Sequence, residues 1–260
     1  MVNNHSLIRQ VFNQLLSGLP LLLIFFLTGC DQPGSGGKKF SPEKYLTQDE
    51  LRKAHRFESL EEALKHSDSA YNLIIFGASL EKVPAKISEL TYLNILELTM
   101  NNLTDLPLEI GNLEYLQSLY IGRNQFEKVP PGILQLKRLK RLDMGSNMLK
   151  DIPGEIFQLD SLEELYLKGN QIASVPEEIV KSKKLRILKL DHNNLDSVPE
   201  ALTRIKSLER LDLSHNNITK LPKELQNMPQ LKWLDLEGNK IDKKSLRSLD
   251  KALKQTKIHY

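Results

Sequence analysis

The 260-residue sequence predicts an α/β solenoid of stacked strands with helical caps at both ends. Three observations predict this fold. One pattern recurs eight times at a constant period over positions 70–253, its leucines alternate at strand spacing, and one asparagine and one proline recur with it. A fixed period of roughly 20–50 residues is typical of units that stack on one another and share one core.

Residues 1–29 predict an export signal. Positions 1–14 carry one base, Arg9, and no acid, and positions 15–29 are almost all apolar. This apolar run is shorter than the roughly 20 residues that a membrane-spanning helix needs. A weakly basic start, an apolar run and small residues before a cleavage site are typical of a secretory signal peptide.

The only cysteine, Cys30, ends the sequence LTGC, which begins at Leu27. These four residues resemble the lipobox of bacterial lipoproteins. The resemblance implies that a diacylglyceryl group is attached to Cys30, that the signal is cleaved before it, and that the chain is anchored in the bacterial cell envelope. Asp31 resembles an inner-membrane retention signal of some Gram-negative bacteria. That signal does not hold in all bacteria, so both the inner and the outer membrane are retained as alternative sites of the anchor. The alternatives are a short buried helix with a structural cysteine, or an ordinary signal peptide with a chance cysteine.

The segment between the cysteine and the repeats predicts a tether and a cap. Residues 30–40 include the sequence DQPGSGG, whose composition is typical of a flexible coil. Residues 41–69 predict a helical N-terminal cap, because TQDE from Thr47 and SLEE from Ser59 both fit the capping-box pattern. SPEK from Ser41 adds a serine before a proline, as at many helix starts. A cap is expected because a bare terminal repeat would expose its leucines.

Each repeat begins with the pattern LxxLxLxxNxL, as in LNILELTMNNL from Leu93. The last two strand leucines are separated by one position, so both side chains point to one face of a short strand. The asparagine after each strand is predicted to be structural, because it can satisfy backbone groups of its own turn and of the next. In the first repeat Ala78 takes its place. The asparagine column consists of Asn101, Asn124, Asn147, Asn170, Asn193, Asn216 and Asn239.

The second half of each repeat carries a proline, as in VPEEI and LPKEL. Proline fixes φ and lacks an N–H group, so it suits an outer segment but would break a central strand. In the last repeat Ser245 replaces it, and SLRSLDKAL predicts a closing helix, followed by a C-terminal tail at 254–260. These patterns resemble the 23-residue LPxxI class of leucine-rich repeats. The resemblance implies a horseshoe or arc with a parallel β-sheet on its concave face and short helical or irregular turns on its outside.

Composition and motifs argue against several functions. Without residues 1–29 the chain carries 35 bases and 33 acids, which shows no bias toward nucleic acid. Too little chain lies outside the repeats for a catalytic domain of typical size. The sequence has no phosphate loop, zincin motif or nucleophile elbow. We therefore expect a non-enzymatic monomer without a cofactor.

Candidate binding residues alternate outward from the strand leucines and line the concave face. Aromatic and arginine side chains carry most of the energy at binding hot spots. The alternative is that these are solvated strand residues, and that Trp233 shields the closing cap. The residues predicted to bind a protein partner are Tyr120, Arg141, Asp143, Tyr166, Lys189, Asp212 and Trp233.

One possible metal site also follows from the repeat. His192 and His215 occupy the same position in neighbouring repeats, and Asp191 lies beside the first. Zinc sites need at least a third ligand at fixed geometry, and the sequence does not identify one. We therefore predict no metal site.

Three functions are compatible with these features. The first is a lipid-anchored module that binds another protein on its concave face. The second is a surface adhesin that recognises molecules of a host or a neighbouring cell. The third is a signalling adaptor, because cytoplasmic proteins with this class of repeat regulate small GTPases. The export signal argues against the adaptor.

We predict that Cys30→Ala moves the protein from the membrane fraction to a soluble form or an unprocessed precursor, because the acyl chains would supply the membrane affinity. Detergent fractionation of cells that express the wild type or the variant measures this. Labelled fatty acid should be incorporated into the wild type alone, and its absence from the wild type would contradict the lipoprotein interpretation.

Overall fold

The computed structural model describes residues 46–260. The predicted signal peptide, the predicted lipid attachment at Cys30, the predicted tether and the predicted helix start at Ser41 all lie outside the described residues. Among residues 46–260, no helix combines the length and the apolar composition that crossing a membrane requires.

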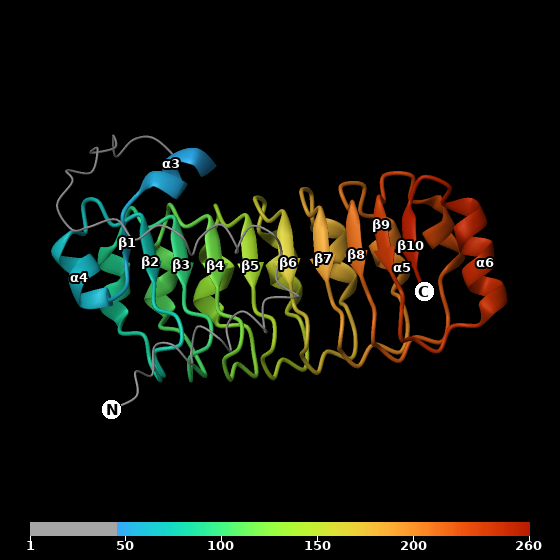
Figure 1. Cartoon of the computed structure of the whole chain (residues 1–260), viewed down its shortest axis with the longest axis horizontal. Coiled ribbons are helices and arrows are strands. Elements are labelled where there is room, and N and C mark those ends of the chain that lie inside the picture. The colour runs from blue at the N-terminus through green and yellow to red at the C-terminus, as the bar shows by residue number, and fades with distance from the viewer. Residues whose placement is uncertain (1–45) are drawn as a thin grey trace, which may run out of the picture. The chain divides into compact units, whose positions relative to one another are not determined.

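Ten parallel strands form one sheet and follow one another in the order of the sequence (Figure 1). The register keeps the period of the repeat, so that Leu165 lies beside Leu188 of the next repeat. The predicted leucine-rich solenoid is confirmed. The eight strands of the repeats are β2 (Asn72–Ile74), β3 (Ile95–Glu97), β4 (Ser118–Tyr120), β5 (Arg141–Asp143), β6 (Glu164–Tyr166), β7 (Ile187–Lys189), β8 (Arg210–Asp212) and β9 (Trp233–Asp235).

Short helices form a second layer behind the sheet, and a proline precedes each of them (Figure 1). The fixed φ of proline suits this entry, and its missing N–H leaves no donor unsatisfied. We name the face of the sheet that points away from these helices the concave face. The helices are η2 (Ala85–Glu89), η3 (Leu108–Asn112), η4 (Pro131–Gln135), η5 (Gly154–Gln158), η6 (Glu177–Lys181), α5 (Glu200–Thr203) and η7 (Lys223–Asn227).

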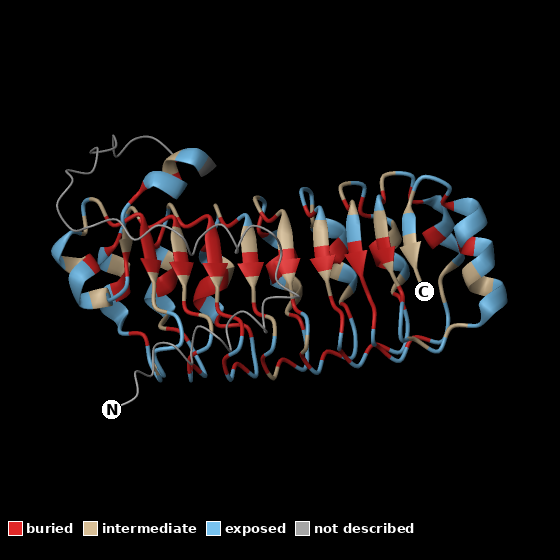
Figure 2. Ribbon diagram, in the orientation of Figure 1, coloured by how far each residue is buried: buried red, intermediate tan, exposed pale blue. Residues whose placement is uncertain are grey.

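The core lies between these two layers, and buried residues mark the middle of the strands in Figure 2. The central leucine of every repeat strand has no exposed surface. One cluster of buried residues runs from Phe57 to Leu253, so all the repeats share a continuous core. The central leucines are Leu73, Leu96, Leu119, Leu142, Leu165, Leu188, Leu211 and Leu234.

The asparagine column forms a ladder of hydrogen bonds inside this core. Asn170 is 8% exposed, and its Nδ2 donates to the carbonyls of Leu167 at 2.9 Å and Met144 at 3.1 Å. Its Oδ1 accepts from the N–H of Leu149 at 3.0 Å. Equivalent backbone partners, in the asparagine's own repeat and in the preceding one, are bonded by Asn101, Asn124, Asn147, Asn193, Asn216 and Asn239. The predicted structural role of the asparagines is therefore confirmed, but their partners outside their own repeat lie in the preceding repeat and not, as predicted, in the next one.

The residue before each ladder position has a left-handed backbone, which the sequence pattern did not indicate. In the eight repeats its φ lies between 52° and 69°. Five of these residues carry a side chain, although an L-residue in this conformation costs about 1–2 kcal/mol. The bonds of the following asparagine fix the turn and offset this cost. The five residues are Met100, Arg123, Ser146, His192 and His215.

The N-terminal cap consists of α3 (Gln48–Lys53), β1 (Arg56–Phe57) and α4 (Leu60–Lys65). Thr47 forms the predicted capping box with Glu50, and the Ser59 hydroxyl accepts from the N–H of Glu62. The strand β1 was not predicted. It pairs with β2 and extends the sheet into the cap.

The C-terminal cap is α6 (Lys243–Ala252), which begins at the N-cap residue Asp242. Residues 254–260, expected only as a tail, include β10 (Lys257–His259). This strand pairs with β9, and the N–H of Leu236 donates to the carbonyl of His259 at 2.8 Å. The extra strand therefore satisfies backbone groups of β9 that would otherwise form the edge of the sheet.

We predict that Asn170→Ala lowers the free energy of unfolding by about 2–4 kcal/mol, because it leaves several buried backbone groups unpaired. Urea unfolding measures the difference. Asn102→Ala, which changes an exposed asparagine next to the ladder, should stay within about 0.5 kcal/mol of the wild type. Equal stability of the two variants would contradict the structural role.

Candidate functional site

Two columns of side chains cover the concave face, because the strands keep one register. All seven predicted binding residues lie on them. The first column is Asn72, Ile95, Ser118, Arg141, Glu164, Ile187, Arg210 and Trp233. The second column is Ile74, Glu97, Tyr120, Asp143, Tyr166, Lys189, Asp212 and Asp235.

The centre of this face holds a chain of four hydrogen-bonded side chains from β4, β5 and β6. Arg141 donates from Nε and Nη2 to the two carboxylate oxygens of Glu164, at 2.7 and 2.8 Å. Its Nη1 donates to the hydroxyl of Tyr120 at 3.2 Å. The hydroxyl of Tyr166 donates to Glu164 at 2.6 Å. We name these four residues the central network.

The charges of the central network reinforce one another. Burial opposes the charge of Arg141, but its hydrogen bonds to Glu164 prevail and raise the pKa of the guanidinium. Burial likewise works to raise the pKa of Glu164, and the bonds from Arg141 and Tyr166 bring it below its usual value. Burial, then the neighbouring Glu164, raises the pKa of Tyr166. Arg141 and Glu164 therefore stay charged, and Tyr166 stays protonated, at neutral pH.

Two acids of the second column accept hydrogen bonds from backbone N–H groups. The carboxylate of Asp143 accepts from the N–H of Gly145 at 2.9 Å, and that of Asp212 accepts from the N–H of Ser214 at 3.3 Å. Asp212 is only 6% exposed. Both were predicted to contact a partner, and the structure gives each of them a role at the end of its own strand.

Trp233 lies at the C-terminal end of the face. The Nζ of Lys189 and the guanidinium of Arg210 each lie 6.0 Å from the centre of its ring. The ring of His259 in β10 lies 5.9 Å away. Lys189 also approaches Asp212 at 3.8 Å. Trp233 is therefore separated from the central network and packs beside the last strand.

The two histidines of neighbouring repeats do come together. The rings of His192 and His215 are 4.3 Å apart, and His192 Nδ1 lies 3.2 Å from the buried carboxylate of Asp191. The ammonium of Lys168 lies 3.1 Å from the same oxygen of Asp191. Within residues 46–260, no group of three or more His, Cys, Asp or Glu side chains is arranged to hold a metal ion.

Glu164 was missing from the predicted binding residues. A signal for it existed, because Arg141 and Glu164 have opposite charges and occupy the same position in consecutive repeats. The repeat period places such a pair side by side on adjacent strands.

Comparison with known families agrees with this architecture. Residues 78–169 match the family described as leucine-rich repeat region, and residues 183–241 match the family described as leucine rich repeat. The chain is a leucine-rich repeat protein. No protein with a curated function matches it in sequence.

Solved structures of bacterial and plant proteins share the fold. A leucine-rich repeat protein of Leptospira interrogans is 33% identical, with a TM-score of 0.66, over 77% of this chain and 57% of that one. An internalin of Listeria monocytogenes is 22% identical, with a TM-score of 0.68, over 78% of this chain and 57% of that one. The ectodomain of the Arabidopsis thaliana receptor kinase GASSHO1/SCHENGEN3 is 24% identical, with a TM-score of 0.57, over 79% of this chain and 28% of that one. This chain thus spans little more than half of each bacterial protein.

We predict that Glu97→Gln gains stability relative to the wild type as the pH rises. Burial raises the pKa of Glu97 to about 7. The folded state therefore binds this proton more tightly than the unfolded state, and the wild type loses stability as the pH rises from about 5 to about 8. The variant lacks this titration and should gain up to about 3 kcal/mol over the same range. Urea unfolding across the range measures the difference, and a difference that does not vary with pH would contradict the assignment.

Proposed function

We propose that this leucine-rich repeat protein is a non-enzymatic module that binds a protein partner on the centre of its concave face. The observation that carries the proposal is the central network. It places two partly exposed tyrosines, Tyr120 and Tyr166, on either side of a paired Arg141 and Glu164.

The chemistry of the central network favours protein recognition. Tyrosine and arginine are enriched at binding hot spots, where they combine apolar area with polar groups. The hydrogen bonds of the network hold its side chains in place before a partner arrives, so less conformational entropy is lost on binding. Arg141 and Glu164 are each 21% exposed at the side chain, so a partner can reach them while they stay paired. A partner that offers aromatic or apolar groups to the tyrosines, and hydrogen-bonding groups to the charged pair, fits this surface.

The proposal includes attachment to a membrane of the bacterial cell envelope through a lipid on Cys30. The sequence LTGC at the end of an apolar run supports it. A lipid anchor of two or more acyl chains would hold the protein stably at a membrane. The repeats would then present the concave face to a partner in the same compartment, with the chain acting as a monomer.

We predict that Tyr120→Ala and Tyr166→Ala each weaken partner binding by about 2 kcal/mol, or roughly 30-fold in affinity, because each removes an aromatic anchor. Capture of partners from envelope extracts on immobilised protein, followed by titration of the captured partner, measures this. The melting temperature should change little, because neither ring faces the leucine core.

The matched controls for these variants are Glu155→Ala and Gln158→Ala, two exposed side chains of η5 on the opposite layer. They should leave capture unchanged. Loss of capture in the η5 variants, with full capture by the tyrosine variants, would exclude the concave face.

A further inference from the structure

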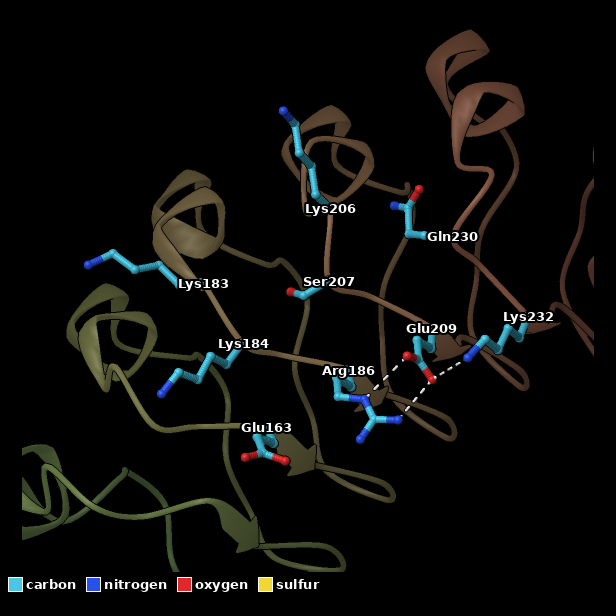
Figure 3. Close-up of a pocket in the computed structure, with 9 residues that line it drawn as sticks. All are labelled: Glu163, Lys183, Lys184, Arg186, Lys206, Ser207, Glu209, Gln230 and Lys232. Carbon is cyan, nitrogen blue, oxygen red and sulfur yellow. Dashed lines mark hydrogen bonds and ion pairs between the residues drawn. The ribbon is translucent and has the colours of Figure 1, made fainter.

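An open groove of about 510 Å³ lies beside the strands β6 to β9, on the segments that lead into them (Figure 3). Five of its nine lining residues are Lys or Arg and two are Glu, so its formal charge is +3. None of these residues belongs to the two columns of the concave face, so the groove is separate from the central network. We name it the basic groove.

Two lysines of the basic groove are available to a ligand. Lys184 and Lys206 are exposed, and neither has an ion-pair partner among the residues that the structure describes. Lys183 pairs with Asp160 at 3.0 Å, but both side chains are about three-quarters exposed. Ion pairs this exposed contribute little energy, so Lys183 is also free to bind another anion.

An ion cluster forms the remaining charged part of the basic groove. Glu209 accepts from Arg186 Nη2 at 3.1 Å and lies 3.0 Å from Lys232 Nζ (Figure 3). These two bases lower the pKa of Glu209, so its carboxylate stays ionised. Glu209 thus competes with any external anion for both bases.

Hydrogen bonds from side chains to backbone carbonyls connect the repeats that form the walls of the basic groove. Ser207 Oγ donates to the carbonyl of Leu185 at 2.8 Å, and Gln230 Nε2 donates to the carbonyl of Ile205 at 2.9 Å. These polar side chains tie neighbouring repeats together, so the repeats beneath the groove keep their spacing. The lysines therefore project from a fixed surface.

The same side of the repeats is covered at the N-terminal end. Tyr92 occupies the position equivalent to Lys184, and it packs against the cluster formed by Leu46, Leu51 and Tyr71. Gln117 Nε2 donates to the carbonyl of Leu46 at 3.3 Å. The N-terminal cap therefore occupies this side of the first repeats, whereas the equivalent side of the later repeats carries the basic groove.

We propose that the basic groove binds a ligand that carries several phosphate groups. Figure 3 shows the side chains of Lys183, Lys184 and Lys206 extending in different directions, so a single phosphate does not reach all of them. A ligand with several anionic groups can contact them in succession. Phosphate suits these partners because it offers up to two charges and three strong acceptor oxygens to Lys and Arg.

Isothermal titration calorimetry of the full chain with tripolyphosphate tests the proposal. Inorganic phosphate, which has a single phosphate group, is the comparison ligand. We expect tripolyphosphate to bind more tightly than inorganic phosphate. The double variant Lys184→Ala with Lys206→Ala should bind tripolyphosphate at least about tenfold more weakly, because it removes the two lysines of the groove that have no competing ion-pair partner among the described residues. The matched control is Lys243→Ala with Lys251→Ala, which removes two exposed lysines from α6 and changes the net charge equally.

A third variant, Glu209→Gln, separates ligand binding from a structural role. It removes the competing carboxylate, so tripolyphosphate should bind more tightly than to the wild type. A groove that only stabilises the fold would show no gain in affinity.

Vesicles of phosphatidylcholine, with and without phosphatidylglycerol, distinguish a lipid source of phosphate from a soluble one. Binding only to vesicles that contain phosphatidylglycerol, lost in the Lys184 and Lys206 variant, would support the proposal with several lipid headgroups of one membrane surface as the source. Three outcomes overturn it. The first is wild-type affinity in the Lys184 and Lys206 variant. The second is the absence of any binding by the wild type, and the third is an equal loss of affinity in the α6 control.

Discussion

The buried asparagine after each strand is the interaction on which the rest of the structure depends. One amide joins three segments, because it bonds a carbonyl of its own strand end and two backbone groups of the preceding repeat. Those backbone groups lie in the interior, where water cannot replace the asparagine. Every turn must therefore adopt the same path, including a left-handed residue that is often not glycine. The constant length of the repeats follows from this requirement.

A fixed period aligns the surface as well as the core. Equivalent positions of neighbouring repeats lie side by side, so opposite charges at that spacing pair across strands. Arg141 with Glu164 on the concave face, and Arg186 with Glu209 in the basic groove, are two such pairs. The first is partly buried and joins two tyrosines, and the second is more exposed and leaves lysines unpaired around it. One rule of spacing thus builds two surfaces with different chemistry.

The sequence predicted the solenoid because leucine, asparagine and proline recur at one fixed period, with Ala78 in place of the asparagine in the first repeat and Ser245 in place of the proline in the last. It also predicted which residues share the concave face, since alternation along a strand needs only the register. It did not predict β1 or β10, because Arg56–Phe57 and Lys257–His259 lack the repeat pattern and gain their strand form from the neighbour they cover. The backbone roles of Asp143 and Asp212 were also missed. An outward position predicts exposure, but a short carboxylate can turn back to an N–H group slightly further along the chain.

The N-terminal and C-terminal caps differ in how many repeats they contact. At the N-terminal end, Leu46 bonds Gln117 and the segment around Leu51 packs on Tyr71 and Tyr92, so the cap spans three repeats. At the C-terminal end, β10 pairs with β9 alone. In a stack where each unit contacts its neighbours, opening starts where the fewest contacts must break. Amide protons should therefore exchange with solvent soonest at the C-terminal end, and the loss of protection should spread from there toward the N-terminal cap.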